Sequence, residues 1–338
     1  MALPSESTDT STQAALAAAR DRAVVCDLAP LHVLAITGAD AATFLNGQLS
    51  IDVAALPVGA CRHASFNSPK GRLLANFVLW RDPAAPGTYL ALLPPDLAQP
   101  VGKRLAMYVL RSKVTLADVS ADSVRLGVGG PGGADALRAA LGAAPAPFEA
   151  LAAGPQTLLG VPGPRFVVVV PVAAAAATRE ALLRHAVAAP LGAWDWLTIR
   201  AGVPVITAAT QDAFVAQTAN WDVLDGIDFR KGCYTGQEII ARMQYLGRLK
   251  ERAHLFHAET PAVAGDRIYS AAFPGQACGT VVNAAAAPGG GFDLLAVLQL
   301  AAAERGDARL NAVDGPLLAP LPLPYAIPAA VAPRGRIV

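Results

Sequence analysis

The chain has few cysteines, and none of them lies in a pattern that binds metal or forms a disulfide framework. The four cysteines, Cys26, Cys61, Cys233 and Cys278, are far apart in the 338-residue sequence and include no Cys-x-x-Cys pair. The five histidines also lack the spacing of metal ligands. We therefore expect no metal site, and we expect three of the four cysteines to be small buried hydrophobic residues.

Charge and long apolar runs are also scarce, which argues against two classes of partner. The formal net charge is +1, so no general electrostatic attraction favours nucleic acid or an anionic membrane. The longest apolar run, residues 166–177, is too short to span a bilayer and contains Pro171. The first residues carry Glu6 and Asp9 and lack the basic and apolar regions of a signal sequence. These features predict a cytoplasmic protein with no membrane contact and no direct nucleic-acid binding.

Apolar and helical segments alternate irregularly along the first part of the chain, which predicts a mixed α and β fold rather than a doubly wound sheet. The predicted elements are strands at 33–36, 73–80 and 89–93 and helices at 40–49 and 96–110. The glycine-rich segment 127–133 is predicted to be a surface turn, because Pro131 interrupts any phosphate-binding pattern. Residues 142–164 are predicted to form a loop.

The second part of the chain changes character after Leu249. Before that point, residues 166–177 are interpreted as a buried strand followed by an alanine-rich connection, and helices are predicted at 178–188 and 193–201. After it, short strand-like runs separated by Gly/Pro turns occur at 253–257, 267–269, 279–282 and 292–300. This pattern predicts a small antiparallel barrel.

The most informative motif is KGCYTGQE at 231–238, which places a lone cysteine near a lysine and between two glycines. Thr235 and Glu238 have the spacing of a capping box, so a helix is expected to begin here and to end near Gly247. The helix N-terminus and Lys231 would both place positive potential at the sulfur of Cys233, which favours the reactive thiolate. An ordinary turn before a capped helix is the alternative, and the residues alone leave both interpretations open.

The segment 226–238, which contains this motif, resembles the signature of the YgfZ family of folate-binding proteins, relatives of the aminomethyltransferase (T protein) of the glycine cleavage system. Further segments resemble blocks of that family in the same order: 44–53, 68–72, 108–114, 200–204, 217–222 and 323–325. The resemblance covers nearly the full length of the chain. It implies an α+β fold in which an aminomethyltransferase-like folate-binding body precedes a small C-terminal antiparallel β-barrel.

The residue pattern and the resemblance together divide the chain into regions. We expect a disordered lead at 1–13, a folate-binding α+β region at 14–248, the barrel at 249–328 and a tail at 329–338. The folate-binding region is expected to contain two subdomains that separate near 120–165.

The cofactor that the resemblance implies is tetrahydrofolate or a one-carbon derivative of it. Cys233 is expected to be the reactive group and Lys231 its electrostatic activator. The residues expected to bind the cofactor are Gly232, Tyr234, Gly236, Gln237, Trp221 and Arg248. Two aromatic residues of this set would stack on the flat rings, and a basic cluster of Arg242, Arg248, Lys250 and Arg252 would bind the glutamate carboxylates of folate.

One departure from the T-protein pattern affects the expected activity. Where aminomethyltransferases carry an acidic pair, this chain has Ala75 and Asn76, so classical methylene transfer is not expected. The resemblance instead implies an accessory protein in iron–sulfur cluster assembly or maintenance, with effects on tRNA modification enzymes. Its expected partners are folate and iron–sulfur client or assembly proteins. Two alternatives remain open: a tetrahydrofolate-dependent one-carbon transferase, and a scaffold whose folate pocket is vestigial.

Overall fold

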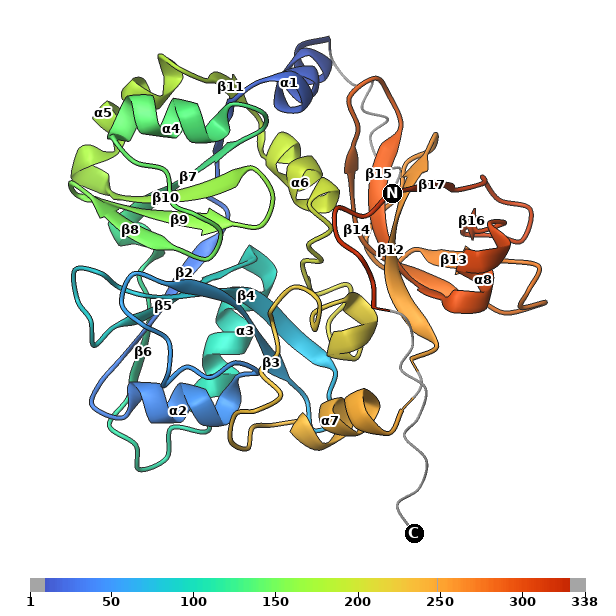
Figure 1. The fold of residues 1–338 in the computed structure, drawn as a ribbon, viewed down its shortest axis with the longest axis horizontal. Coiled ribbons are helices and arrows are strands. Elements are labelled where there is room, and N and C mark those ends of the chain that lie inside the picture. Colours follow the sequence, from blue (N-terminus) through green and yellow to red (C-terminus); the bar gives the residue numbers. More distant parts are fainter. Residues whose placement is uncertain (1–9, 248, 329–338) are drawn as a thin grey trace.

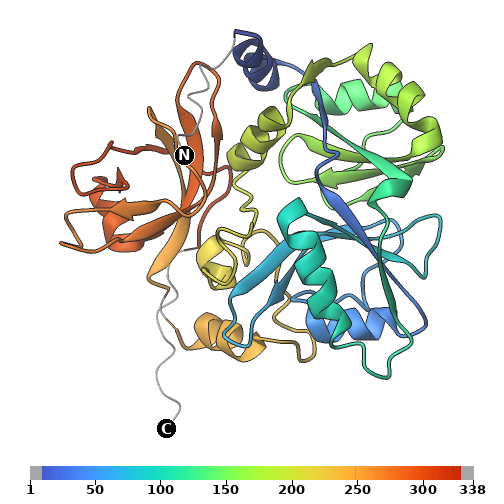
Figure 2. The ribbon, with the colours of Figure 1, turned by 180° about the vertical axis from the view of Figure 1, so that it is seen from behind.

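The structure is a computed structural model that describes residues 10–247 and 249–328. Three β-sheets form its framework, with helices on their outer faces and one helix between them (Figure 1). The view from behind shows the same arrangement, with the third sheet set apart from the other two (Figure 2). The predicted α+β class is confirmed. The expected tail at 329–338 lies outside the described residues.

A five-stranded antiparallel sheet has the strand order β3-β4-β5-β2-β6. Its strands are β2 (His32–Thr37), β3 (Cys61–Asn67), β4 (Leu73–Arg81), β5 (Tyr89–Leu93) and β6 (Thr115–Asp118). Helices α2 (Ala41–Gln48) and α3 (Pro95–Ala106) bury their apolar sides in the same core. The strands predicted at 33–36, 73–80 and 89–93 and the helix at 40–49 are confirmed. The helix predicted for 96–110 ends earlier, at Ala106, and a turn follows it.

A six-stranded sheet has the order β11-β1-β7-β10-β9-β8, in which β1 pairs with β11 in parallel and the other pairs are antiparallel. Its strands are β1 (Val24–Asp27), β7 (Ser123–Gly129), β8 (Ala150–Ala153), β9 (Gln156–Val161), β10 (Arg165–Pro171) and β11 (Val187–Ala189). Helices α4 (Gly133–Leu141) and α5 (Val172–Leu183) pack against this sheet, and the short η1 (Ser120–Asp122) precedes β7.

Three predictions for this second sheet were wrong. The segment 127–133 is not one surface turn, since Gly127 and Gly129 lie within β7. A Cβ atom at Gly127 would lie 2.5 Å from the ring of Trp194, so close helix–strand packing explains the glycine. Residues 142–164 contain β8 and β9 rather than a loop. The alanine run after Pro171 is the first part of α5 rather than a connection, which agrees with the high helix propensity of alanine.

Helix α6 (Leu191–Arg200) joins the six-stranded sheet to the third sheet. It packs with α1 (Thr10–Asp21) and with side chains of β12 and β15 in one hydrophobic cluster. The helix predicted at 193–201 is thus confirmed within one or two residues. Helix α1 begins at Thr10, so residues 10–13 are helical rather than disordered as expected for 1–13, and residues 1–9 lie outside the described part.

The third sheet has the order β16-β13-β14-β15-β12-β17, with antiparallel pairs throughout. Its strands are β12 (Glu251–Ala258), β13 (Arg267–Tyr269), β14 (Gly279–Ala286), β15 (Phe292–Gln299), β16 (Arg309–Leu310) and β17 (Ala319–Leu321), with α8 (Leu300–Arg305) after β15. The four predicted strands are confirmed. The sheet curls, but the edge strands β16 and β17 do not pair with each other within the described residues. It is therefore a half-barrel and not the closed barrel that was expected.

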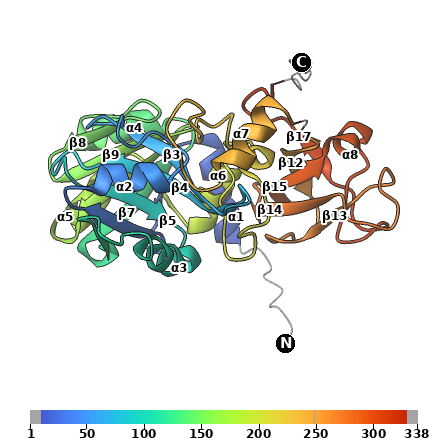
Figure 3. The ribbon, with the colours of Figure 1, turned by 90° about the horizontal axis from the view of Figure 1, so that it is seen from below.

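The chain between α6 and the third sheet contains η2 (Ala216–Ala219) and α7 (Gln237–Tyr245). Helix α7 lies between α2 and β12 in the views from the front and from below (Figures 1 and 3). In the part of the chain that the structure describes, no helix has both the length and the apolar character needed to cross a bilayer.

Candidate functional site

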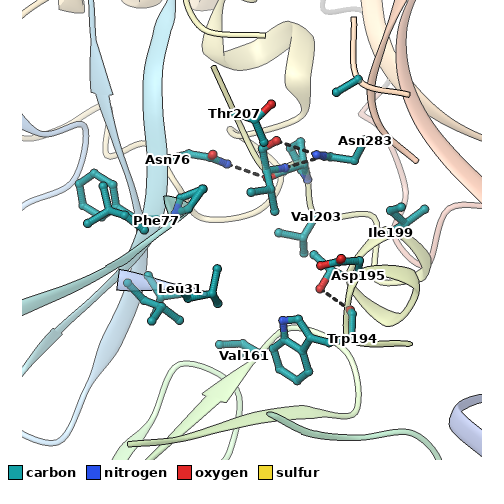
Figure 4. A pocket seen from close by; sticks show the side chains of 18 of the residues that line it. Leu31, Asn76, Phe77, Val161, Trp194, Asp195, Ile199, Val203, Thr207 and Asn283 are labelled. Atoms are coloured by element: carbon teal, nitrogen blue, oxygen red, sulfur yellow. Dashed lines mark hydrogen bonds between the residues drawn. The ribbon is translucent and has the colours of Figure 1, made fainter. Parts of the chain in front are cut away.

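A cavity of about 430 Å³ lies where the three sheets meet. Its wall includes Asn76 and Phe77 of β4, Val161 of β9, Asp195 of α6 and Asn283 of β14 (Figure 4). Most of the other lining side chains are apolar. A concave, mainly apolar space with a few polar groups is typical of a small-molecule site.

Two asparagines in the cavity wall use their side-chain amides to hold the segment 203–207. Asn76 Nδ2 donates to the Pro204 carbonyl at 2.7 Å, and the Ile206 amide donates to Asn76 Oδ1 at 2.8 Å. Asn283 makes the same paired contacts with the backbone of Val205, both at 2.7 Å. These side chains therefore shape the wall, and Asn76 occupies one of the two positions where an acidic residue was noted as missing.

His63 of β3 adds an acceptor to the wall. Its ring is buried and stacks on Trp221, with the ring centroids 4.8 Å apart. Burial lowers the pKa of His63 to about 4, so the imidazole is neutral near neutral pH. Its Nδ1 lies 2.9 Å from the Leu224 carbonyl, which can only accept, so this nitrogen carries the hydrogen. Nε2 is left as a hydrogen-bond acceptor.

Helix α6 and β10 supply the charged groups of the cavity. Arg165 is buried, and it donates to the Pro162 carbonyl at 2.8 Å and to the Thr198 hydroxyl at 2.7 Å. Burial lowers the pKa of this guanidinium to about 9, which still leaves it charged near neutral pH. Asp195 faces the cavity between Trp194 and Ile199 (Figure 4). Burial among the surrounding atoms raises the pKa of its carboxyl group to about 6.

The KGCYTGQE loop lies at a second place, on the surface beside α2 and the β3–β4 turn. Its glycine Gly236, with φ 83°, is the N-cap of α7, and no side chain caps the helix. The predicted capping box of Thr235 and Glu238 is therefore wrong. A Cβ atom at Gly236 would collide with the Ser68 carbonyl, so both the backbone angle and the close approach require glycine here. Helix α7 ends at Tyr245, close to the expected end at Gly247.

Lys231 is buried within this loop and holds the loop against α2. Its ammonium group donates to the carbonyls of Leu49, at 2.7 Å, and of Asn46, at the C-terminal end of α2. The nitrogen also lies 4.7 Å from the ring centroid of Tyr234, which is a cation–π contact. Burial lowers the pKa of Lys231 to about 8. The lysine therefore has a positioning role beside any effect on the neighbouring thiol.

Cys233 differs from the other three cysteines in its surroundings. Its side chain is exposed, whereas Cys26, Cys61 and Cys278 are buried, as predicted for three of the four. Burial raises the pKa of both Cys26 and Cys61 to about 12, which keeps these thiols protonated and unreactive. Cys233 is thus the accessible thiol among the described residues.

The expected site residues separate into two groups. Trp221 lines the cavity, whereas Lys231, Gly232, Cys233, Tyr234, Gly236 and Gln237 belong to the surface loop and do not line it. Arg248 lies outside the described residues. Of the remaining basic cluster, Arg242 and Lys250 are exposed, but Arg252 is buried and forms an ion pair with Asp222 at 2.6 Å, so it is not available to a ligand.

Sequence reasoning missed the charged and aromatic groups of the cavity, His63, Arg165, Trp194 and Asp195. They come from elements that are far apart in the chain, and no local motif joins them. The signal that was present is Asp195, an acidic residue between the two tryptophans Trp194 and Trp196 of helix α6. No group of three or more His, Cys, Asp or Glu residues is positioned to hold a metal ion within residues 10–247 and 249–328.

The arrangement of three sheets around a central cavity defines an aminomethyltransferase-like fold. The fold is similar to that of the glycine cleavage system aminomethyltransferase T from Bartonella henselae, with a TM-score of 0.69 and 18% identity over 91% of this chain and 87% of that one. Residues 4–162 match the model of the GCVT N-terminal domain.

Two curated relatives narrow this class. The chain is 31% identical over 303 residues to the tRNA-modifying protein YgfZ of Sodalis glossinidius, a match that covers 87% of this chain and 90% of the relative. It is also 31% identical over 307 residues to the protein of that name from Serratia proteamaculans, with the same coverage. The chain belongs to the YgfZ family.

Proposed function

We propose that this protein binds folate and acts as an accessory protein in iron–sulfur cluster assembly or maintenance, with effects on tRNA modification enzymes. The observation that carries the folate part is the cavity at the junction of the three sheets, which is mainly apolar and has few polar groups. Support for the tRNA part comes from the relatives, which are named tRNA-modifying proteins.

Tetrahydrofolate, or a one-carbon derivative of it, fits the chemistry of the cavity wall. A pterin ring is planar and presents adjacent N–H donors, and the wall offers two acceptors, the carboxyl group of Asp195 and Nε2 of His63. The aromatic face of Trp194 suits a planar ring, and it is held in place by the Arg165 guanidinium 5.3 Å above it. When bound, tetrahydrofolate would supply a carrier for one-carbon units.

Cys233 is proposed as the reactive group toward client proteins, because its side chain is exposed and its loop is fixed by hydrogen bonds to α2. Lys231 fixes this loop through the carbonyls of Asn46 and Leu49. Gln237 supports it further, since its side chain donates to the Lys231 carbonyl at 3.4 Å. A fixed backbone with an accessible thiol suits a group that must meet a partner protein.

A one-carbon transferase is the second candidate, and Asp195 is the observation that favours it. The acids are absent at positions 75 and 76, and the amide of Asn76 is occupied by backbone groups. Asp195 nevertheless places a carboxyl group of raised pKa in the same cavity, where it could exchange a proton with a ligand.

The test is calorimetric titration of the protein with tetrahydrofolate under anaerobic conditions, together with an assay for methylenetetrahydrofolate formation. We expect binding with no turnover. Absence of binding at millimolar ligand would reject the folate proposal, and a measurable rate of one-carbon transfer would favour the second candidate. The iron–sulfur part is tested separately, by the activity of an iron–sulfur tRNA-modifying enzyme in cells that carry or lack this protein.

A further inference from the structure

The turn between α3 and β6 presents large apolar side chains to solvent. Met107 is 74% exposed and Leu110 is 88% exposed, and neither lines the central cavity. Leu110 has φ 47°, in the left-handed region that a bulky side chain rarely adopts. The turn is anchored by Tyr108, whose ring meets that of Phe66 of β3 edge to face with the centroids 6.4 Å apart. Apolar side chains gathered on one exposed turn are a feature of protein interaction surfaces.

The charge around this turn is of one sign. Residues 97–117 contain four Lys and Arg residues and no Asp or Glu, although the whole chain has 27 of the former and 26 of the latter. All four, Lys103, Arg104, Arg111 and Lys113, are exposed. None of them is in an ion pair within residues 10–247 and 249–328. An apolar centre with a rim of one charge is complementary to a partner of the opposite charge.

The strand that follows the turn has a free edge. Strand β6 is the last strand of the five-stranded sheet, and in the described part of the chain it pairs only with β2. The Val119 amide donates to the Val33 carbonyl at 2.9 Å, and residues of an antiparallel pair bond to the partner strand alternately. Ala117 therefore bonds to β2, whereas the backbone N–H and C=O groups of Leu116 and Asp118 point away from it. Another polypeptide strand can pair with these groups.

We propose that the turn at 107–113 and the outer edge of β6 form a docking surface for an extended, acidic segment of a partner protein. The backbone of that segment adds to β6, its apolar side chains contact Met107 and Leu110, and its carboxylates face the four basic residues. The free edge favours a polypeptide over a lipid surface or a nucleic acid, because only a polypeptide offers donors and acceptors at the spacing of a strand. The surface uses no residue of the cavity or of the KGCYTGQE loop, so this inference goes beyond the proposed function and does not depend on it.

The experiment uses the full-length protein and a fluorescein-labelled peptide of alternating Glu and Val, about eight residues long, as an ordinary strand is. We expect saturable binding in fluorescence anisotropy. A Lys–Val peptide should not bind, and neither should a Glu–Val peptide with an N-methylated backbone, which keeps the charge but lacks the donors. Leu110→Ser and Arg111→Glu should each weaken binding by about 10-fold or more. The matched controls, Val313→Ser and Arg267→Glu, change exposed residues elsewhere and should leave binding unchanged.

Hydrogen exchange measured by NMR locates the bound peptide. In the free protein the Ala117 amide should exchange slowly and the amides of Leu116 and Asp118 rapidly, and the Glu–Val peptide should protect the latter two. Absence of binding at millimolar peptide, equal binding of the Lys–Val or N-methylated peptide, or unchanged exchange at Leu116 would each overturn the proposal.

Two further probes test the other classes of partner. If phosphatidylglycerol vesicles or an RNA hairpin bind through Leu110 and Arg111 while the Glu–Val peptide does not bind, the surface serves a lipid or a nucleic acid and the proposal is wrong. Tetrahydrofolate affinity should be the same in Leu110→Ser and Arg111→Glu as in the wild-type protein, because neither residue lines the cavity. Failure of this inference therefore leaves the proposed function to its own test.

Discussion

The central cavity and the KGCYTGQE loop are held together in the same way, but they present their reactive groups to different surroundings. In the cavity, Asn76 and Asn283 are tied to backbone, and Asp195 is left facing the interior space. In the loop, Lys231 is tied to backbone, and Cys233 is left facing outward. Each region thus has a fixed frame and one free reactive group, but the two groups face different surroundings. Ligand affinity and thiol reactivity should therefore respond to different mutations.

The largest expected effect is the loss of function on replacing Cys233 in the KGCYTGQE loop. Cys233→Ser keeps the size of the side chain and removes the thiol chemistry. We expect it to abolish support of iron–sulfur client enzymes in cells and to leave tetrahydrofolate affinity unchanged, because Cys233 does not line the cavity. Iodoacetamide should also modify the folded wild-type protein at Cys233 first, since Cys26, Cys61 and Cys278 are buried.

Cys278→Ser is the matched control for this substitution, because it changes a buried cysteine of the third sheet. It should preserve both client support and the pattern of alkylation. Full client support by Cys233→Ser would show that the thiol of this residue has no role in function. A loss of folate affinity in the same variant would show that the loop and the cavity are energetically coupled, although the structure places them apart.

The next effect concerns the attachment of the cavity wall to the third sheet. Arg252 of β12 donates to the Gln217 carbonyl at 2.7 Å and to both carboxylate oxygens of Asp222 at 2.6 and 3.0 Å. Arg252→Met would leave Asp222 buried without its partner, which costs about 3–5 kcal/mol. Urea unfolding should show this loss. Folate affinity should fall because Trp221 lies between these contacts, while the alkylation rate of Cys233 stays the same.

Arg267→Met is the control for that variant, because Arg267 is an exposed arginine of the same sheet. Its free energy of unfolding should change by about 0.5 kcal/mol or less. Equal losses in the two variants would mean that the ion pair of Arg252 and Asp222 does not secure the cavity wall.

The sequence predicted those elements whose pattern is local. The strand β4 is a nearly continuous apolar run, and β2 and β5 are similar, so their burial is visible in composition alone. The glycines of β7 led to the wrong prediction of a turn, because glycine is required there by tertiary packing and not by a turn. A Cβ atom at Gly129 would lie 2.7 Å from the side chain of Leu197 of α6. Tertiary packing also explains Gly236. The close approach of the β3–β4 turn requires glycine at the N-cap of α7, and the side chain of Thr235 does not cap the helix.

The site was predicted only in part for the same physical reason. The loop with Cys233 is contiguous, so one motif identifies it. The cavity is assembled from β3, β4, β10, α6 and β14, and its polar residues have ordinary local sequences. Trp221 and Asn76 were singled out through the family resemblance, whereas Asp195 becomes noticeable only when the structure places it in the cavity wall.

A moderate effect is expected from filling the cavity. Ala264 lines the cavity and is half-buried, so a tryptophan there would project into the space without disrupting a core position. Ala264→Trp should weaken tetrahydrofolate binding by about 10-fold or more, because the ligand must displace the new ring. Client support should fall only if folate is required for it. Val313→Trp, at an exposed position, is the control. Unchanged affinity in Ala264→Trp would place the folate site elsewhere.

The smallest expected effect is on stability and has the opposite sign from the loss of binding. Burial raises the pKa of Asp195 from 3.8 to about 6, so between these values the folded protein holds a proton that the unfolded chain has released. This contribution to stability is complete below pH 3.8 and is lost as the pH rises through about 6. Near neutral pH the charged carboxylate is therefore a burden on the fold, and Asp195→Asn should raise the melting temperature by about 2 °C, a modest gain because the cavity admits solvent.

The gain should shrink as the pH approaches 4, where the wild-type carboxyl group is also neutral. The control Glu304→Gln, which removes an exposed carboxylate of α8, should show no such trend. Calorimetric scans of the three proteins across this range measure the difference directly. A gain that is the same at every pH would mean that the asparagine acts through packing and not through charge. A more stable protein that binds tetrahydrofolate less well would show that the cavity keeps Asp195 for its ligand at the expense of the fold, since stabilising changes at functional sites commonly cost function.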